Sequence, residues 1–564
     1  MQMTIPQPVR PPEDRAETLW WTGLLAATTL NCLVQIAWFW RYRAHSINED
    51  GIAYIGLARH LVDGNFKASL HGYWSPLISW IIAAAAVFGR NFTLMGRLVT
   101  IASFLLCLPL LYVLTFKLWR SRTAAALAAF CFSVARGLVF LAVGSIVADF
   151  VLTACVLLYF TFLLDALRQN QSANWIRLGA VHGLAFLAKA IAMPWLSIAS
   201  AIAVLLRNWR SPRRLAASLL LAFLFPAIVW GSWGTALRTK YGVFTTGYQL
   251  RANLMTNWRR LQSHRRIGDS LAFADTSSLY DNYMVGDTWP SVRAFSLRNA
   301  GLLNMIVAAE VRNIPQAVKE TLILLTPAAA LAFLFMLALL IRSRGQYEPE
   351  AAFAGIAMLS TLSLIAAYCM LVFDGRYVIP IVPVLIAIGC PLLLPVKLAP
   401  GAPHVSPWLQ KAGLGLLAAS VVFFAVYWAS PLRTVDRDFE ASCYQAAAVL
   451  RRAGSAGTLV SIGDGPYPEH GVGFEAGPYV AYLAEWRLVG GNSELPRASD
   501  ADSLCSKALA AKADAVAVWG SPADPAYIQI VNKVKLTPGL RSASPFADPN
   551  KGEVGTIFLF RGKD

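Results

Sequence analysis

Residues 95–116 read MGRLVTIASFLLCLPLLYVLTF, an apolar run interrupted by a single charged side chain, that of Arg97. About 20 such residues suffice for a helix to cross a bilayer. Comparable runs recur through most of the chain, whose 564 residues are 56% hydrophobic and 14% charged, with a mean hydropathy of +0.51. Soluble domains carry roughly 25% charged residues. The composition therefore excludes a soluble enzyme, a fibrous protein and a disordered chain, and predicts a multi-pass membrane protein.

About eleven apolar segments are expected to cross the membrane as helices. They lie near residues 18–40, 95–116, 123–142, 147–166, 177–195, 196–206, 214–236, 320–341, 352–372, 376–396 and 411–430. The N-terminal segment lacks a small-residue cleavage site, so we expect an uncleaved first span. A shorter apolar run, residues 76–89, has the length of an interfacial or re-entrant segment.

Charge decides how these spans are oriented. If residues 76–89 do not cross and the N-terminus is cytoplasmic, the basic clusters at 117–122, 207–214 and 342–344 all face the cytoplasm, as the positive-inside rule requires. We therefore expect residues 76–89 to lie in the outer interface. The same rule accounts for much of the net charge of +17. No basic run is interleaved with stacking aromatic residues, so nucleic acid is not an expected partner.

Two domains follow from this topology. Residues 1–430 form an all-α polytopic membrane domain, with outer loops at 41–94 and 237–319. Residues 431–564 form a small extracytoplasmic α/β domain, because helix-like and strand-like stretches alternate there. The helix-like stretches are Asp436–Arg452 and Ala501–Ala513, and the strand-like ones are Thr458–Ile462, Ala515–Trp519 and Thr556–Phe560.

Two of the eight cysteines, Cys443 and Cys505, fall in this polar domain. A disulfide between them would imply an oxidising compartment, and the sequence leaves that pairing open. The other six lie in or beside apolar runs, where cysteine behaves as a small hydrophobe. No Cys/His spacing typical of a zinc site occurs.

Charged residues at the outer ends of the predicted spans are the candidate functional residues, because ionisable side chains within a membrane are costly. They are Glu49, Asp50, Asp149, Lys189, Asp374 and Arg376. Carboxylates and cations that converge on one water-facing cavity suit a reaction with an anionic leaving group. Each also has a purely structural reading: Asp50 as a helix-start acid, Lys189 as a snorkelling side chain, Asp149 as a partner of Arg136, and Arg376 as an anchor of a helix end.

Four motifs in order resemble the GT-C glycosyltransferases over roughly residues 15–400. The first is EDGIAYIGLAR at residues 49–59, followed by WSPL at 74–77. The others are DFVLT at 149–153, GLAFLAK at 183–189 and RYVIPIVP at 376–383. The resemblance extends to the lipid A aminoarabinose transferases and to the protein O-mannosyltransferases.

The resemblance implies an enzyme of the bacterial inner membrane that takes a sugar from a polyprenyl-phosphate donor on the outer leaflet. The acceptor would be a lipid, glycan or protein of the envelope. Asp50 stands at the position of the general base. The substrate-binding residues that the resemblance implies are Glu49, Tyr54, Arg59, Asp149, Lys189, Arg376 and Tyr377.

Elementary chemistry agrees with these roles. A phosphate leaving group needs a cation as its charge develops, which Lys189 or Arg376 could supply. One carboxylate base without a covalent intermediate implies inversion at the anomeric carbon. Asp149 would position Lys189, Arg59 or the acceptor. The aromatic residues Tyr73 and Trp74, with the run 76–89, could form the wall along which the prenyl chain enters.

Two features depart from the relatives. Lipid A aminoarabinose transferases usually carry Lys-Pro-Pro-Leu where this chain has WSPL at residues 74–77, so that substrate does not follow. Some relatives use a divalent metal, the one cofactor left open here; Glu49 and Asp50 point apart on a helix, so a metal site does not follow from them. The absence of GxGxxG and P-loop motifs argues against a directly bound nucleotide.

The loop 237–319 contains the sequence Gly247-Tyr248-Gln249 and the acidic residues Asp269, Asp275, Asp281 and Asp287. We expect it to cap the site and, with the C-terminal domain, to select the acceptor. The alternative to an enzyme is a flippase or transporter, which should place its charges near the bilayer midplane on broken helices.

Overall fold

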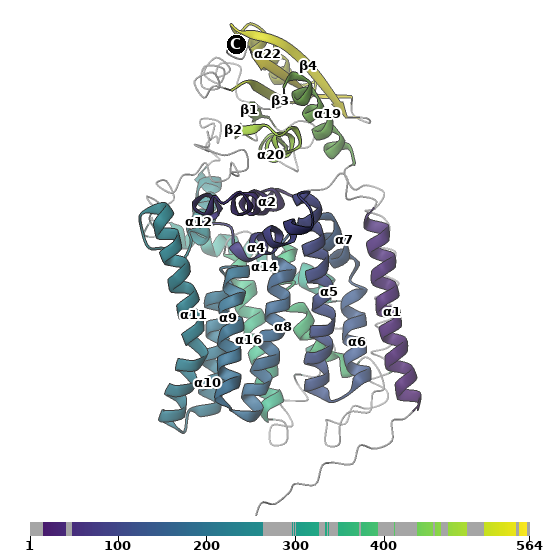
Figure 1. The fold of residues 1–564 in the computed structure, drawn as a ribbon, viewed down its shortest axis with the longest axis vertical. Coiled ribbons are helices and arrows are strands. Elements are labelled where there is room, and N and C mark those ends of the chain that lie inside the picture. Colours follow the sequence, from purple (N-terminus) through teal and green to yellow (C-terminus); the bar gives the residue numbers. More distant parts are fainter. Residues whose placement is uncertain are drawn as a thin grey trace, which may run out of the picture.

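The computed structural model describes residues 15–40, 48–262, 301–325, 348–370, 374–392, 437–454, 457–463, 472–492, 513–548 and 552–560, with a few isolated positions between them. Long helices form a bundle, and a small α/β domain lies at one end of it (Figure 1). The bundle contains α1 (Arg15–Trp40), α5 (Phe92–Trp119), α6 (Arg122–Ser133), α7 (Arg136–Gly144), α8 (Asp149–Gln169), α9 (Ser172–Ala188), α10 (Ala192–Asn208), α11 (Pro212–Tyr241), α16 (Glu348–Cys369) and α17 (Val382–Gly389).

Five described helices are long and apolar enough to cross a membrane: α1 from Glu17, α5, α8, α11 and α16 from Pro349. The bent pair α6–α7 adds a sixth if it counts as one span. Helices α9 and α10 have 17 residues each and pack beside α8 and α11 (Figure 1). The expected spans at 320–341 and 411–430 lie largely outside the described residues.

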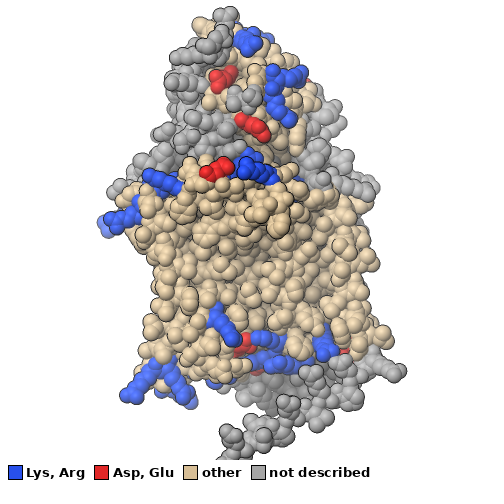
Figure 2. Space-filling view, viewed as in Figure 1, with Lys and Arg blue, Asp and Glu red and all other residues tan. Residues whose placement is uncertain are grey.

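The surface of the bundle has the charge distribution of a membrane protein. Figure 2 shows acidic and basic side chains at two levels of the bundle, with a broad band free of them in between on this face. Large apolar side chains such as Leu30, Leu33, Leu220 and Phe225 are exposed on α1 and α11. This band is the surface expected to contact lipid.

The helix boundary expected near Pro194, between the spans 177–195 and 196–206, is wrong. Helix α9 ends at Ala188, Lys189 has an extended backbone, and α10 begins at Ala192. Pro194 lies in the first turn of α10, where proline is tolerated because that N–H has no helical partner. The break therefore comes earlier and leaves Lys189 at a helix end.

Part of the expected outer loop 237–319 is helical. Helix α11 runs to Tyr241, and α12 (Gln249–Gln262) and α14 (Leu302–Leu325) follow. Helix α14 also runs past residue 320, where a separate span was expected to begin. Its buried residues Leu302, Met305, Ala309 and Ala317 recur at helical spacing, and this amphipathic pattern explains a helix within a polar region.

At the end of the bundle nearest the α/β domain, α2 (Glu49–Val62) and α4 (Pro76–Ala85) lie across the other helices (Figure 1). Short segments complete this part of the chain: α3 (Phe66–Ser69), η2 (Ala86–Phe88), η5 (Gly375–Val378) and η6 (Cys390–Leu392). Helix α4 has ten residues, too few to cross a bilayer.

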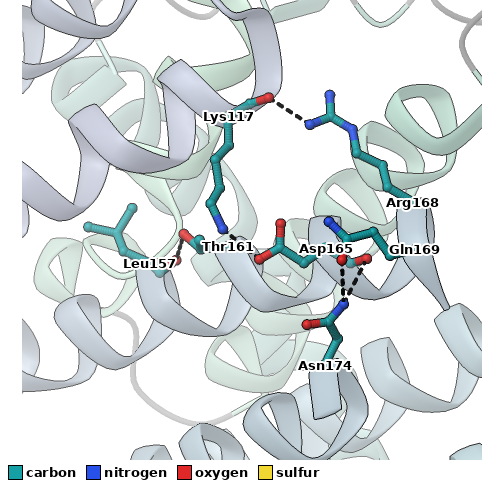
Figure 3. Close-up of polar contacts among 7 residues, drawn as sticks. All are labelled: Lys117, Leu157, Thr161, Asp165, Arg168, Gln169 and Asn174. Atoms are coloured by element: carbon teal, nitrogen blue, oxygen red, sulfur yellow. Dashed lines mark hydrogen bonds and ion pairs between the residues drawn. The ribbon is translucent and has the colours of Figure 1, made fainter. Parts of the chain in front are cut away.

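A polar network joins α5, α8 and α16 at the opposite end of the bundle. Lys117 Nζ lies 2.5 Å from Asp165 Oδ2, and Arg168 Nη1 donates to the Lys117 carbonyl oxygen at 2.7 Å (Figure 3). Arg168 Nη2 also lies 2.6 Å from Glu350 Oε1. The last carbonyl groups of a helix lack helical hydrogen-bond donors. Arg168 supplies such a donor at the end of α5 and also forms an ion pair with Glu350 of α16.

The C-terminal domain has a five-stranded mixed sheet in the order β2-β1-β3-β5-β4. Strands β2, β1 and β3 are parallel, whereas β5 runs antiparallel to both of its neighbours. Its elements are α19 (Arg437–Ala453), β1 (Thr458–Ile462), α20 (Val472–Ala484), β2 (Arg487–Asn492), β3 (Ala515–Trp519), α22 (Pro525–Lys535), β4 (Leu540–Asp548) and β5 (Gly552–Phe560). Strands β1 and β3 have the expected bounds. The predicted helix Ala501–Ala513 lies almost entirely outside the described residues. Of the two cysteines of this domain, Cys443 is buried and Cys505 lies outside the described residues.

The C-terminal domain rests on α2. Helix α20 packs against α2, and the Tyr482 hydroxyl forms a hydrogen bond with Thr93 Oγ1 at the start of α5. The Arg59 guanidinium lies 5.2 Å from the centre of the Phe92 ring and 5.7 Å from that of Tyr482. The domain is therefore docked on the helix that carries Asp50 in its first turn.

Candidate active site

Four segments that are distant in the chain meet at the end of the bundle that carries α2. They are the first turn of α2, the start of α8, the end of α9 and the short helix η5. These segments bring together Asp50, Asp149, Lys189, Asp374, Arg376 and Tyr377. We call these six residues the charged cluster.

Asp149 and Lys189 form the deeper ion pair of the charged cluster. Lys189 Nζ lies 2.7 Å from Asp149 Oδ1, and the side chains are 12% and 2% exposed, respectively. Asp149 is the first residue of α8, where the helix dipole favours a carboxylate. Lys189, one of the partners considered for Asp149, thus lies in contact with it. The side chain of Arg136, the structural alternative, lies outside the described residues.

Arg376 bridges two carboxylates. Its Nη1 lies 2.7 Å from Asp50 Oδ2 and its Nε lies 2.8 Å from Asp374 Oδ2. Asp374 also caps η5, because its Oδ1 accepts from the backbone N–H of Arg376 at 3.1 Å. The side chains of Asp50 and Arg376 are 22% and 21% exposed, so both are reachable from solvent. Arg376 thus couples the first outer loop to the segment before α17.

Aromatic rings lie against both cations. The Tyr377 ring centre is 4.9 Å from Lys189 Nζ and 5.5 Å from Arg376 Cζ, distances at which a ring face stabilises a cation. Tyr368, near the end of α16, stacks on Tyr377 with a centroid distance of 4.1 Å and an angle of 15°. Sequence reasoning missed Tyr368, because an aromatic residue at a span end is also typical of a membrane interface.

A second aromatic group borders the charged cluster. Tyr54 lies one helical turn after Asp50 and packs edge-on against Trp74, which packs in the same way against Tyr73. Burial raises the pKa of Tyr54 well above its usual value, and the nearby carboxylates of Asp50 and Asp149 raise it further, although Arg376 acts in the opposite direction. The Tyr54 phenol therefore stays neutral, able to donate a hydrogen bond.

The described part of the loop 237–319 contacts the first outer loop. The Tyr73 hydroxyl donates to Asn253 Oδ1 on α12 at 2.9 Å, and the Tyr248 backbone N–H donates to the Gly72 carbonyl oxygen at 2.9 Å. These contacts lie beside Trp74. The four acidic residues from Asp269 to Asp287 lie outside the described residues.

Besides Tyr54, which borders the charged cluster, two further candidate residues are not among its six members. Arg59 lies nine residues after Asp50 on α2, about 13 Å along the helix axis, and its guanidinium contacts Phe92 and Tyr482. These contacts place Arg59 at the junction with the C-terminal domain, and its expected role in binding substrate stays a prediction. Glu49 is the first residue of α2, but its side chain lies outside the described part of the chain.

Asn48 fixes the start of α2, and sequence reasoning missed it. It is the N-cap residue of α2, and its Oδ1 accepts from the Ile146 backbone N–H at 2.8 Å, which ties α2 to the segment before Asp149. Gly51 makes this approach feasible, because a Cβ there would lie 2.7 Å from Asn48 Oδ1 and 3.0 Å from Ile146 Cβ. The glycine of the EDG motif is thus required by packing.

Within the described residues, no three His, Cys, Asp or Glu side chains are grouped in a way that could hold a metal ion. The charged cluster instead offers two cations and three carboxylates, one of which, Asp374, is 47% exposed. Such a site can bind an anionic group through Lys189 and Arg376 and can accept a proton on Asp50.

Comparisons with known proteins concern the family and the fold. The family described as dolichyl-phosphate-mannose-protein mannosyltransferase matches residues 73–233, a range that includes Asp149 and Lys189. The crystal structure of ArnT from Cupriavidus metallidurans in the apo state is similar with a TM-score of 0.53 and 15% identity, covering 96% of this chain and 98% of that chain.

The crystal structure of the same ArnT bound to undecaprenyl phosphate gives a TM-score of 0.49 and 13% identity over the same shares of the two chains. None of the curated proteins matches the sequence. At 15% identity, the likeness to the apo structure shows that the two chains share a fold. The family match and this fold confirm the resemblance to the GT-C glycosyltransferases.

Proposed function

We propose that this protein is a membrane glycosyltransferase that moves a sugar from a polyprenyl-phosphate donor to an acceptor at the outer face of the membrane. The single observation that carries the proposal is the charged cluster, in which Asp50, Arg376, Asp149 and Lys189 meet at one end of an apolar bundle. The matched family is described by a dolichyl-phosphate-linked donor, which supports the same class of donor here.

The outer face is assigned by charge. Lys117 and Arg168 gather at the end of the bundle opposite the charged cluster, and basic residues of short loops favour the cytoplasmic side. The N-terminus is then cytoplasmic, and the C-terminal domain extracytoplasmic. We expect the protein in the bacterial inner membrane.

Lys189 and Arg376 are the proposed ligands of the donor phosphate. Lys189 is held in place by Asp149 and by the Tyr377 ring, so its ammonium group is oriented before the donor arrives. Preorganised cations stabilise charge on a leaving group at little reorganisation cost. Asp149 would be a positioning residue that acts through Lys189.

Asp50 is the proposed general base, although its carboxylate is bound to Arg376. We infer that the donor phosphate competes for this guanidinium and leaves an oxygen of Asp50 free for the acceptor. The acceptor oxygen then attacks the anomeric carbon and gives its proton to Asp50. The bond from that carbon to the phosphate oxygen breaks, the phosphate leaves with the electron pair, and the configuration inverts.

The aromatic group Tyr54, Tyr73 and Trp74 and helix α4 form the proposed wall for the prenyl chain. Beyond α4, Val87 and Phe88 are 85% and 89% exposed, as expected of residues that enter the lipid. A flippase or transporter is less well supported, because its binding charges should lie near the middle of the bundle. The acceptor is a lipid, glycan or protein of the envelope.

Purified protein should transfer label from radiolabelled polyprenyl-phosphate sugars to a membrane extract, and Asp50→Asn should abolish this transfer. Asp63→Asn is a matched control, because Asp63 is exposed at the other end of α2 and should leave transfer unchanged. Transfer by Asp50→Asn at the wild-type rate would refute the proposed base. Failure of the folded wild-type protein with every donor would refute the proposed function.

A further inference from the structure

The C-terminal domain contains a groove of about 630 Å³ between the end of α19 and strand β4. The two elements are labelled side by side in Figure 1. Sites for small molecules commonly enclose ~300–1,000 Å³, so the groove has room for a sugar ring and its substituents. It belongs to a different domain from the charged cluster, and no step of the proposed reaction uses it.

Cations dominate the charge of this groove. Arg452 enters from α19 and Arg541 from β4, and both side chains are exposed. Neither guanidinium forms an ion pair with a carboxylate in the part of the chain that the structure describes. Guanidinium groups bind phosphate and carboxylate oxygens through paired hydrogen bonds. Two of them facing one groove therefore favour an anionic ligand.

The remaining lining suits a polyhydroxylated ligand. Ser542 and Ser544 lie on β4, two residues apart and so on the same face of the strand. The carboxylate in the groove, Asp514, is engaged: its Oδ2 accepts from the backbone N–H and the hydroxyl of Thr458, each at 2.8 Å. Asp514 therefore joins the starts of β1 and β3 and leaves the groove with a net positive charge.

We propose that this groove binds the phosphorylated sugar of a glycan, with Arg452 and Arg541 on the phosphate and the two serine hydroxyls on the ring. An isolated phosphate ion would leave most of the volume empty, and a neutral sugar would not need the two guanidinium groups. On the proposed function, on which this last step rests, the glycan belongs to the acceptor. The docking of this domain on α2 would then hold the acceptor near Asp50.

The test is a direct binding measurement that needs no catalysis. Full-length protein in nanodiscs of phosphatidylcholine is titrated calorimetrically with glucose 6-phosphate, glucose, glucuronic acid and inorganic phosphate. Arg452→Gln and Arg541→Gln should each weaken glucose 6-phosphate binding by about tenfold, as expected for loss of one charge-assisted contact. Arg451→Gln removes the neighbouring charge on α19 outside the groove and should bind like the wild type.

Several results would overturn the proposal. They are the absence of glucose 6-phosphate binding, binding that neither groove variant weakens, and equal weakening in Arg451→Gln. Inorganic phosphate or glucuronic acid binding as tightly as glucose 6-phosphate would refute the phosphorylated sugar. Loss of binding in nanodiscs that contain phosphatidylglycerol would assign the groove to lipid headgroups instead. If glucose 6-phosphate binds as expected but sugar transfer is never observed, the binding site in the groove is supported and only its role with the acceptor is refuted.

Discussion

Asp50 and Arg376 face each other across the boundary between α2 and η5, with 2.7 Å between carboxylate Oδ2 and guanidinium Nη1. The pair joins the first and last of the motifs that suggested a glycosyltransferase. About a fifth of each side chain is exposed, and an incoming phosphate would offer the guanidinium a new anionic partner in place of the carboxylate. A competing phosphate could therefore replace Asp50 at Arg376, which is the behaviour that the proposed mechanism needs.

Replacing Arg376 should impair catalysis by removing a cation from the leaving group. We expect Arg376→Gln to reduce transfer by about a hundredfold, the effect of losing one preorganised donor to a developing charge. Arg376→Lys keeps a charge but not the planar fork and should retain an intermediate rate. Initial rates at varied donor concentration measure both. Wild-type rates in Arg376→Gln would contradict the assignment of this residue to the phosphate.

The buried pair Lys189–Asp149 should affect stability and activity separately. Lys189→Met leaves the almost fully buried Asp149 carboxylate unpaired and should lower the free energy of unfolding by about 3 kcal/mol. The double variant Lys189→Met/Asp149→Leu removes both charges and should recover most of that loss, yet remain inactive. Denaturant titration and transfer assays on the three proteins test this. A double variant as unstable as the single one would argue against a charge effect.

Sequence reasoning placed Asp50, Asp149, Lys189 and Arg376 at one end of the bundle, because topology and hydropathy determine which residues lie at span ends. It left the pairing of Asp149 open, since that depends on how α8 and α9 are rotated about their axes, which packing alone decides. Asn48 was missed because its contact with Ile146 joins segments that are distant in the chain, and Tyr368 because an aromatic residue at a span end is also typical of a membrane interface. Helix α14 was missed because its region was interpreted as a polar loop from its overall composition. The apolar residues of the buried face of α14 are spaced among polar ones and do not stand out in that composition.

The contact between α2 and the C-terminal domain should break at Arg59. Arg59→Ala removes a guanidinium from the Phe92 and Tyr482 rings, interactions worth about 1 kcal/mol each where they are partly desolvated. We expect limited proteolysis to release a C-terminal fragment faster from this variant, and transfer to fall because α2 carries Asp50. Arg90→Ala, an exposed arginine close to the same junction, is the control. Identical release rates for wild type and Arg59→Ala would show that another contact holds the domain.

The network around Arg168 should contribute to stability alone, because it lies at the opposite end of the bundle from the charged cluster. Arg168→Met removes the ion pair with Glu350 and the hydrogen bonds to the carbonyl oxygens of Lys117 and Leu118. Glu350 is 14% exposed, so its charge would be left largely buried without a partner, at a cost of about 3 kcal/mol.

Denaturant titration should show this loss, whereas the donor KM of the folded fraction should equal that of the wild type. Arg177→Met removes an exposed arginine of α9 and should change neither quantity. In Arg168→Met/Glu350→Leu the unpaired carboxylate is gone, so much of the stability should return. A raised donor KM in Arg168→Met at full stability would mean that this end of the bundle is coupled to the charged cluster, and the separation of the two roles would be wrong.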